Sequence, residues 1–262
     1  MTSRRGGSPW IDAFAAGEWV RDGAMIAIGG VGTSRKPMAL VRALVESGLR
    51  ELRIVSVLGS VDVDFLIASG SVAEVHTAGV AIDGVGMAPR FRHARQTGEV
   101  RVVEWSEGSL YAALEAAARG LPSLACGTSP ESDVVAGNEW LAVAADPFTG
   151  EPVVHARAMT PDLALVHAPE ASSTGDVHID GDAGFDVVTA CASRSVVVSA
   201  ERVSRRPGRD ASLSRVWVDA VVLAPGGAWP TACYPMSAVD PQALQGWVKS
   251  KGDPAVLTGV TT

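Results

Sequence analysis

The sequence predicts an α/β protein built on an open parallel sheet, and two observations support this. The first is a strand–helix–strand pattern near the start: an apolar run at Ala24–Ile28, a helix opening at Pro37, and a second apolar run at Leu52–Leu58. The second is that short apolar runs keep alternating with helical and loop segments along the chain. This alternation favours a parallel sheet with right-handed crossovers.

The first elements follow from local chemistry. Ile11–Val20 predicts a short amphipathic helix, and Arg21–Gly23 predicts a turn. Pro37 suits the first turn of a helix, because a missing N–H costs nothing there. Gly48 then ends that helix before the second strand begins.

The same pattern continues to the end of the chain. The segment Cys126–Pro152 is rich in Gly, Pro, Ser and Asp, so it is predicted to be irregular, either a lobe or an insertion. No shift in composition marks a boundary, and we expect one domain over residues 1–262. The remaining predicted elements are strands at Arg101–Trp105, Leu163–His167, Ser195–Ser199 and Val218–Ala224, and a helix at Ser109–Arg119.

Composition excludes several classes of protein. The net charge of −7 and the lack of a basic face argue against a nucleic-acid partner. No apolar stretch reaches the roughly 18 residues of a membrane span, and Met1–Trp10 lacks the apolar run of a signal peptide. Cys126, Cys191 and Cys233 show neither metal-ligand spacing nor a disulfide framework. We therefore expect a cytoplasmic protein without a metal or a tightly bound organic cofactor.

The glycine-rich turn Gly29–Gly32 lies between the first predicted strand and its helix. Such a turn suits an oxyanion or a phosphate, because backbone N–H groups converge there. A dinucleotide site is not favoured. Gly30–Arg35 lacks a third glycine, and the second strand ends in Leu58–Gly59 without an acidic residue.

A longer string around this turn resembles the signature of the class I CoA-transferase family. Asp22–Val31 followed by Pro37 matches its Asp-Gly turn, apolar residues, glycine pair and later proline. Val31 stands where phenylalanine is usual, and Arg35 stands where a glycine is usual. Both departures are similar to the branch that contains glutaconate-type transferases and the ring-opening hydrolases of steroid degradation.

Four further stretches extend the resemblance over most of the chain. Pro89–Gly98, Asp162–His167 and Val218–Thr231 look like the same branch, and Asp146–Gly150 is similar to a CoA-transferase-like decarboxylase of glutaconyl-CoA. The resemblance implies an α-type subunit that pairs with a homologous β-type subunit in a heterodimer or heterotetramer. It also implies an acyl-CoA substrate, with CoA as part of the substrate.

The family resemblance leaves the reaction open. One fold can host several chemistries, so CoA transfer, thioester hydrolysis, hydrolysis of a ring carbon–carbon bond and decarboxylation all stay possible. Cys126 occupies the position where the ring-opening hydrolases carry an arginine, which argues against that reaction. A catalytically silent binding subunit is a further alternative.

Glu107 is the residue that we expect to carry chemistry. In the family a glutamate carboxylate attacks the thioester, and ordinary transferases place it in the other subunit. The ring-opening hydrolases resemble this chain in placing a glutamate before a glycine, as in Glu107-Gly108. In the structural alternative, Ser106 caps the following helix and Glu107 interacts favourably with the helix dipole. The nucleophile would then belong to the partner.

The resemblance also assigns roles within the loop. Gly30, Val31 and Gly32 are expected to offer N–H groups to the thioester oxygen as it gains charge. Alternatively, Gly29 and Gly30 are glycines because the turn requires positive φ.

The remaining candidates are basic residues and histidines. Arg35 and Lys36 are candidates for binding a CoA phosphate or a substrate carboxylate, although exposed basic residues at a helix start are common. Of the histidines nearest the motifs, His93 and His167, the second is expected to be a hydrogen-bonded structural residue or an outer neighbour of the site.

Overall fold

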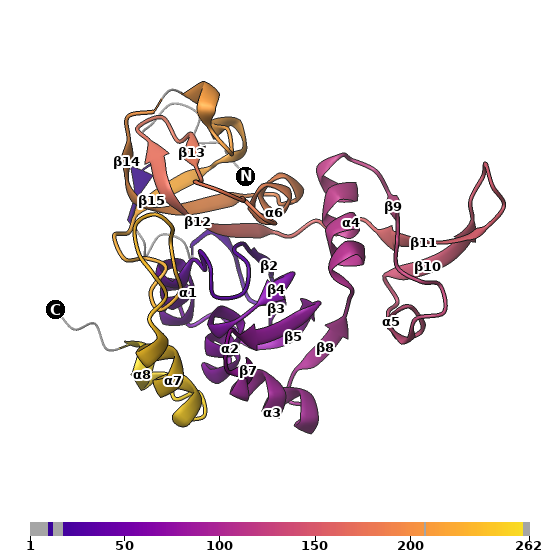
Figure 1. The fold of residues 1–262 in the computed structure, drawn as a ribbon, viewed down its shortest axis with the longest axis horizontal. Coiled ribbons are helices and arrows are strands. Elements are labelled where there is room, and N and C mark those ends of the chain that lie inside the picture. Colours follow the sequence, from indigo (N-terminus) through magenta and orange to yellow (C-terminus); the bar gives the residue numbers. More distant parts are fainter. Residues whose placement is uncertain (1–9, 13–17, 207, 259–262) are drawn as a thin grey trace.

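A computed structural model describes residues 10–12, 18–206 and 208–258. One large sheet dominates the molecule (Figure 1). Along its main path every neighbouring pair of strands is parallel, which confirms the predicted sheet type. The strand order is β1 (Trp10–Ile11), β15 (Ala220–Leu223), β14 (Val196–Ser204), β12 (Leu163–Ser172), β2 (Met25–Ile28), β3 (Leu52–Val55), β5 (Val72–Thr77) and β8 (Arg101–Glu104).

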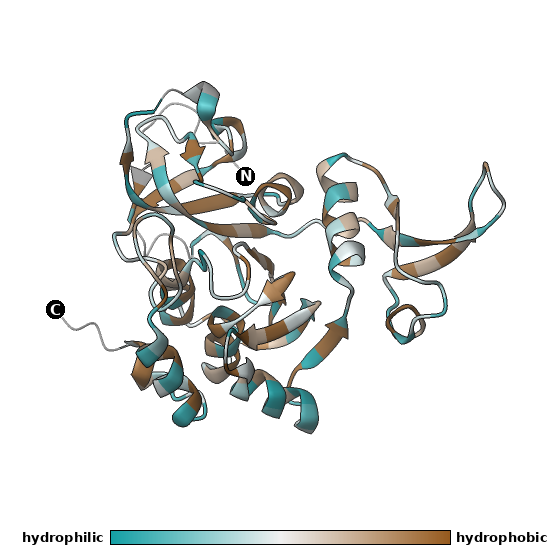
Figure 2. Ribbon diagram, in the orientation of Figure 1, coloured by the Kyte–Doolittle hydropathy of each residue, from teal (hydrophilic) through white to brown (hydrophobic). Residues whose placement is uncertain are grey.

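Helices cover both faces of this sheet, and β2 shows why. Ile26 and Ile28 face one core cluster, while Met25 and Ala27 face another, as expected for alternating side chains of a strand buried on both faces. Figure 2 shows the hydrophobic colour gathered in the central strands, with hydrophilic residues on outer helices such as α3. The first face carries α1 (Met38–Glu46), α2 (Val61–Ala68), α3 (Pro89–Thr97), α7 (Pro241–Lys249) and α8 (Ala255–Thr258), and the second carries α4 (Glu107–Ala118) and α6 (Asp186–Ala192).

Two central strands are longer than predicted. β12 extends to Ser172 and β14 to Ser204, because buried polar residues such as His167 and Glu170 continue the strands beyond their apolar runs. The predicted second strand, by contrast, ends at Val55. The remaining short elements are β4 (Leu58–Gly59), β6 (Gly79–Ile82), β7 (Gly86–Met87), β13 (Val177–His178), η2 (Gly208–Asp210) and η3 (Arg215–Trp217).

The predicted helix at Ile11–Val20 is wrong at its start. Trp10 and Ile11 form an edge strand beside Val221 and Val222, because backbone pairing to the sheet outweighs the local helical pattern. Residues 13–17 of that prediction lie outside the described residues. The predicted turn that follows is confirmed, since the Ala24 N–H donates to the Arg21 carbonyl oxygen at 3.1 Å.

The segment predicted to be irregular is an ordered lobe. β9 (Ser123–Cys126), β10 (Leu141–Ala145) and β11 (Pro152–Arg157) form a small antiparallel sheet beside α4, with α5 (Asp133–Ala136) between β9 and β10 (Figure 1). The turn residues that suggested irregularity form the hairpin loop, where Asp146 accepts N–H groups from Phe148 and Thr149. One domain over residues 1–262 stays a prediction. No helix among the described residues has the length and apolar character needed to cross a membrane.

Candidate active site

The glycine-rich loop leaves the carboxyl end of β2, between β12 and β3. Gly30 has φ +75°, and a Cβ there would lie 2.5 Å from the Ser34 carbonyl oxygen. This confirms the need for positive φ at Gly30. Gly29 is glycine for another reason, because its φ is not positive and a Cβ there would collide with Asp186 Oδ1. Close approach to a buried carboxylate, rather than turn geometry, excludes a side chain at Gly29.

The three N–H groups predicted to bind the thioester oxygen all have acceptors within the chain. Gly30 N–H donates to Asp186 Oδ1 at 2.5 Å. Val31 N–H donates to the Ser34 carbonyl at 3.0 Å, and Gly32 N–H donates to the Leu58 carbonyl at 3.2 Å. Oxyanion binding would require these groups to change acceptors. That role stays a prediction, whereas the observed bonds show a loop that is held rigidly.

Asp186, the first residue of α6, is the residue that holds this loop. Its buried carboxylate accepts the Gly30 N–H and pairs with the Arg35 guanidinium, whose Nη2 lies 3.1 Å from Oδ2. Burial raises the pKa of this carboxyl group, while the charge of Arg35 and the N–H of Gly30 oppose that rise. The sequence pattern did not reveal Asp186, because its partners are 151 and 156 residues away. An acidic residue at a helix start is too common to serve as a signal.

Arg35 and Lys36 are buried, so the expectation of exposed basic residues at a helix start is wrong. Lys36 Nζ donates to the Leu58 carbonyl at 2.8 Å and the Gly30 carbonyl at 3.2 Å, and it lies 3.3 Å from Asp62 Oδ2. Both cations are therefore neutralised inside the protein. Their predicted role toward CoA stays a prediction, and their contacts favour the stabilisation of the loop.

Glu107 is exposed at the first position of α4. Ser106 caps the helix as predicted: its Oγ accepts the Ser109 N–H at 3.1 Å, and its own N–H donates to Ser109 Oγ at 3.1 Å. Within the described part of the chain, the Glu107 carboxylate has no hydrogen-bond or ion-pair partner. The helix start is well stabilised while its carboxylate remains accessible.

Glu107 and the glycine loop lie at the same edge of the sheet. β2 and β8 are parallel, so the segments that follow them leave from the same side. β3 and β5 stand between them, and three strand spacings of roughly 4.8 Å separate the two sites by about 14 Å. The fold places both candidates on one edge without direct contact.

Two hydroxyl groups and a thiol lie beside the start of α4. Ser106 Oγ is 2.7 Å from Thr128 Oγ1, and the half-buried Cys126 thiol donates to the same hydroxyl at 3.7 Å. Cys126, predicted from the family resemblance to replace an arginine, is therefore close to the residue that precedes Glu107.

His167 is buried in β12 and is hydrogen-bonded as predicted for a structural residue. Its Nδ1 lies 2.8 Å from Ser199 Oγ, and its Nε2 lies 3.0 Å from Glu201 Oε1. Burial favours a higher pKa for Glu201, but the hydrogen bonds from His167 and Gly226 hold that pKa below its ordinary value. His93 lies exposed on α3.

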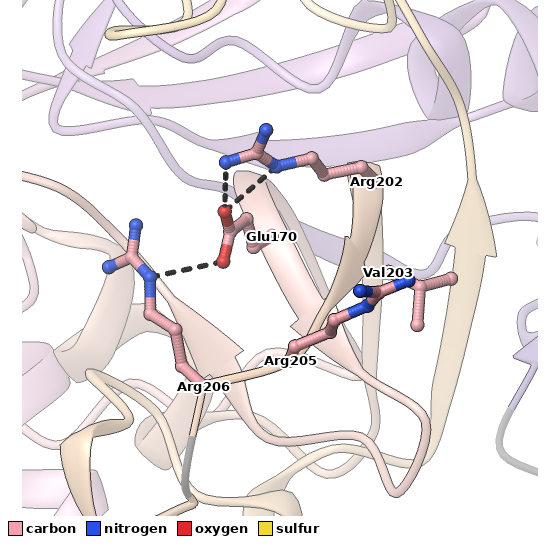
Figure 3. A pocket seen from close by; sticks show the side chains of 5 residues that line it. All are labelled: Glu170, Arg202, Val203, Arg205 and Arg206. Carbon is pink, nitrogen blue, oxygen red and sulfur yellow. Dashed lines mark hydrogen bonds and ion pairs between the residues drawn. The ribbon is translucent and has the colours of Figure 1, made fainter.

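An arginine-rich pocket of about 450 Å³ lies at the far ends of β12 and β14 (Figure 3). Glu170 occupies its wall, accepts from Arg202 Nε at 2.8 Å and Ser204 Oγ at 2.7 Å, and lies 3.1 Å from Arg206 Nε. Arg206 also pairs with Asp180 at 2.8 Å. Most of the positive charge is thus neutralised internally. The lining residues are Glu170, Arg202, Val203, Arg205 and Arg206.

An open parallel sheet with a rigid glycine loop and an accessible carboxylate on one edge defines a class of α/β enzyme. The sequence matches the family model for coenzyme A transferase over residues 13–224. The chain therefore belongs to the coenzyme A transferase family, which confirms the resemblance.

Characterised relatives span several reactions. The IpdA subunit of the cholesterol ring-cleaving hydrolase of Rhodococcus jostii is 35% identical over 263 residues, covering 89% of this chain and 88% of that protein. One of the subunits of glutaconate CoA-transferase from Acidaminococcus fermentans is 32% identical over 247 residues, covering 85% of this chain and 76% of that protein.

Solved structures confirm the fold. The decarboxylase AibA/AibB C56S variant superposes with a TM-score of 0.88 at 32% identity, covering 97% of this chain and 98% of that chain. Glutaconate coenzyme A-transferase from Acidaminococcus fermentans superposes with a TM-score of 0.89 at 29% identity, covering 96% of this chain and 86% of that chain. The shared fold thus hosts transferase and decarboxylase activities.

Proposed function

We propose that this chain is the α-type subunit of a cytoplasmic heteromeric enzyme that acts on an acyl-CoA thioester, with Glu107 as its reactive carboxylate. The accessibility of Glu107 carries the proposal. It is an unpaired carboxylate, within the described residues, at the start of a 12-residue helix on the same sheet edge as the glycine loop. A helix N-terminus favours the ionised form of a carboxylate.

The carboxylate would act as a nucleophile. One oxygen of Glu107 attacks the thioester carbonyl carbon, the carbon–sulfur bond breaks, and CoA leaves as a thiolate. This step forms a mixed anhydride. Attack of the thiolate on the glutamyl carbonyl then gives glutamyl-CoA and releases the acid, whereas attack of water on the anhydride completes hydrolysis.

A homologous β-type subunit would complete the site. Large apolar side chains are exposed on this chain, including Phe148 at 94%, Val216 at 78% and Tyr234 at 68%. Exposed apolar patches commonly mark interfaces. We expect the chain alone to lack thioester activity and to self-associate in light-scattering measurements. An active, monodisperse monomer would contradict the two-subunit proposal.

Decarboxylation is the second candidate, with the key residue in the partner. Cys126 in place of the arginine disfavours ring opening, and the AibA/AibB decarboxylase matches nearly the whole chain in structure. In this alternative the chain contributes the glycine loop and the substrate pocket, while Glu107 stabilises the helix start.

Trapping the acyl-enzyme distinguishes the two candidates. The chain is co-expressed with the product of the neighbouring reading frame, incubated with a panel of acyl-CoA esters, reduced with borohydride, and analysed by peptide mass spectrometry. Reduction of a glutamyl thioester at Glu107 supports the first candidate. A reduced residue in the partner contradicts the role of Glu107, and CO₂ release without a trapped glutamyl species favours decarboxylation.

A further inference from the structure

Three potential metal ligands of different types meet beneath the glycine loop. His167 projects from β12, Glu201 from β14, and Cys233 from the segment that follows β15. Their ligand atoms all lie within 4.8 Å of one another. His167 and Cys233 are fully buried, and the Glu201 side chain is 9% exposed. We propose that His167, Glu201 and Cys233 bind one divalent transition-metal ion of the zinc type.

The ligand set fits this class of ion. Zinc accepts imidazole nitrogen, carboxylate oxygen and thiolate sulfur at about 2.0–2.3 Å, so tetrahedral ligand atoms lie roughly 3.4–3.6 Å apart. His167 Nε2 and Glu201 Oε1 are 3.0 Å apart, already close to this spacing. An approach of about 1 Å by the sulfur would complete three ligands, with the fourth position left for water.

Outer contacts already orient two of the three ligands. His167 Nδ1 contacts Ser199 Oγ at 2.8 Å, which leaves Nε2 directed at the cluster. Glu201 Oε2 accepts the Gly226 N–H at 2.6 Å, which leaves Oε1 for the ion. Such contacts commonly fix the tautomer and orientation of metal-binding side chains. Both residues are on paired strands, because His167 is in register with Ser199.

The third ligand is on a segment that can adjust and that connects to the glycine loop. Ala232 N–H donates to the Thr33 carbonyl at 2.9 Å, and Arg35 N–H donates to the Ala232 carbonyl at 2.7 Å. Cys233 follows directly. A metal ion bound to its thiolate would therefore clamp the glycine loop to β12 and β14, in addition to the bonds made by Asp186.

Charge also favours the metal-bound form. A divalent ion with one thiolate and one carboxylate is neutral overall, which limits the cost of burial. Without the ion, burial raises the pKa of Cys233 to about 12, so the thiol keeps its proton at neutral pH. Metal binding must displace that proton. The neutral imidazole releases none, because its proton can reside on Nδ1 beside Ser199.

Sequence spacing could not reveal this cluster. The three ligands lie on separate elements, and His167 is 34 residues from Glu201. The expectation of no metal rested on the lack of closely spaced ligands, and the parallel pairing of β12 and β14 brings distant ones together.

Cobalt titration of the chelator-treated protein, purified with its partner if it requires one, tests the proposal. We expect one equivalent of Co²⁺ to bind, with a near-ultraviolet thiolate-to-cobalt absorption that zinc abolishes by competition. Cys233→Ser should remove this absorption, while Cys191→Ser, a control at a half-buried cysteine in α6, should retain it. His167→Gln and Glu201→Gln should each weaken cobalt binding by at least about tenfold.

A second measurement needs no variant. Because one thiol proton leaves, the apparent affinity of the unmodified protein for cobalt should rise about tenfold for each pH unit near neutral pH. Absence of stoichiometric cobalt binding would overturn the proposal. So would a thiolate absorption that persists in Cys233→Ser, or an affinity that does not change with pH.

Discussion

The glycine loop and the start of α4 lie on the same edge of the sheet, yet they differ in almost every physical respect. The loop is buried, and the N–H groups of Gly30, Val31 and Gly32 all have internal acceptors. Glu107 is exposed and, among the described residues, its carboxylate has no partner. A motif residue can therefore shape a site from within or wait at its surface, and only the second kind is available to a substrate.

The two regions should also respond differently to substitution. The loop depends on two buried ion pairs, Arg35–Asp186 at 3.1 Å and Lys36–Asp62 at 3.3 Å. Removing one member of a buried pair leaves an uncompensated charge, which lowers stability. Removing an exposed carboxylate leaves folding nearly unchanged. We thus expect loop variants to lose stability and Glu107 variants to lose turnover.

Glu107→Gln should have the largest effect on function. An amide has no comparable attacking oxygen, so turnover should fall by several orders of magnitude if Glu107 is the nucleophile. A role as general base predicts a loss of roughly 10²–10⁴-fold. The free energy of unfolding should change by only about 0.3–1 kcal/mol through the helix dipole.

Steady-state kinetics of the two-subunit enzyme and a thermal melt measure both quantities. Glu131→Gln, at another exposed glutamate, is the matched control and should change neither. Normal turnover by Glu107→Gln would move the reactive group to the partner.

Asp186→Asn should have the largest effect on stability. The change leaves the buried Arg35 guanidinium without its ion pair, and breaking such a pair costs about 3–5 kcal/mol. Urea unfolding measures the loss. Asp182→Asn changes an exposed carboxylate in the preceding loop and should cost no more than about 0.5 kcal/mol. Equal stability of the two variants would show that Asp186 does not hold the loop.

Gly30→Ala should be less damaging but still measurable. The new Cβ would sit 2.5 Å from the Ser34 carbonyl oxygen at φ +75°, so backbone strain of about 1–3 kcal/mol is expected together with reduced turnover. Gly23→Ala is a close control, because its φ is +76° and nothing lies within 4 Å of the added Cβ. If both variants lose the same stability and activity, close packing at Gly30 is unimportant.

Ser106→Ala should have the smallest effect of the four. Loss of the cap on α4 should lower the free energy of unfolding by about 1 kcal/mol, with turnover reduced only slightly because Glu107 is retained. Ser132→Ala removes the cap of the short α5 and should cost less, since that helix has only 4 residues. Denaturant titrations compare the two. A large loss of turnover in Ser106→Ala would mean that the hydroxyl itself takes part in the reaction.

The sequence alone determined those features that depend on neighbouring residues. The strand at β2, the helix after Pro37, and the cap at Ser106 follow from apolar runs, proline geometry and a short polar side chain. The glycine loop and Glu107 were found in the same way, because the motif around each is continuous in the chain. The family followed from these motifs in order.

Tertiary structure decided everything that depends on residues far apart in the chain. Edge pairing converted Trp10–Ile11 into a strand, and the carboxylate of Asp186, 156 residues from Gly30, turned the loop into a buried network. Local preferences amount to fractions of a kcal/mol per residue, whereas burial of a charge or of a backbone donor costs several. Where the two compete, long-range burial prevails, and no local pattern records which distant residue will provide the partner.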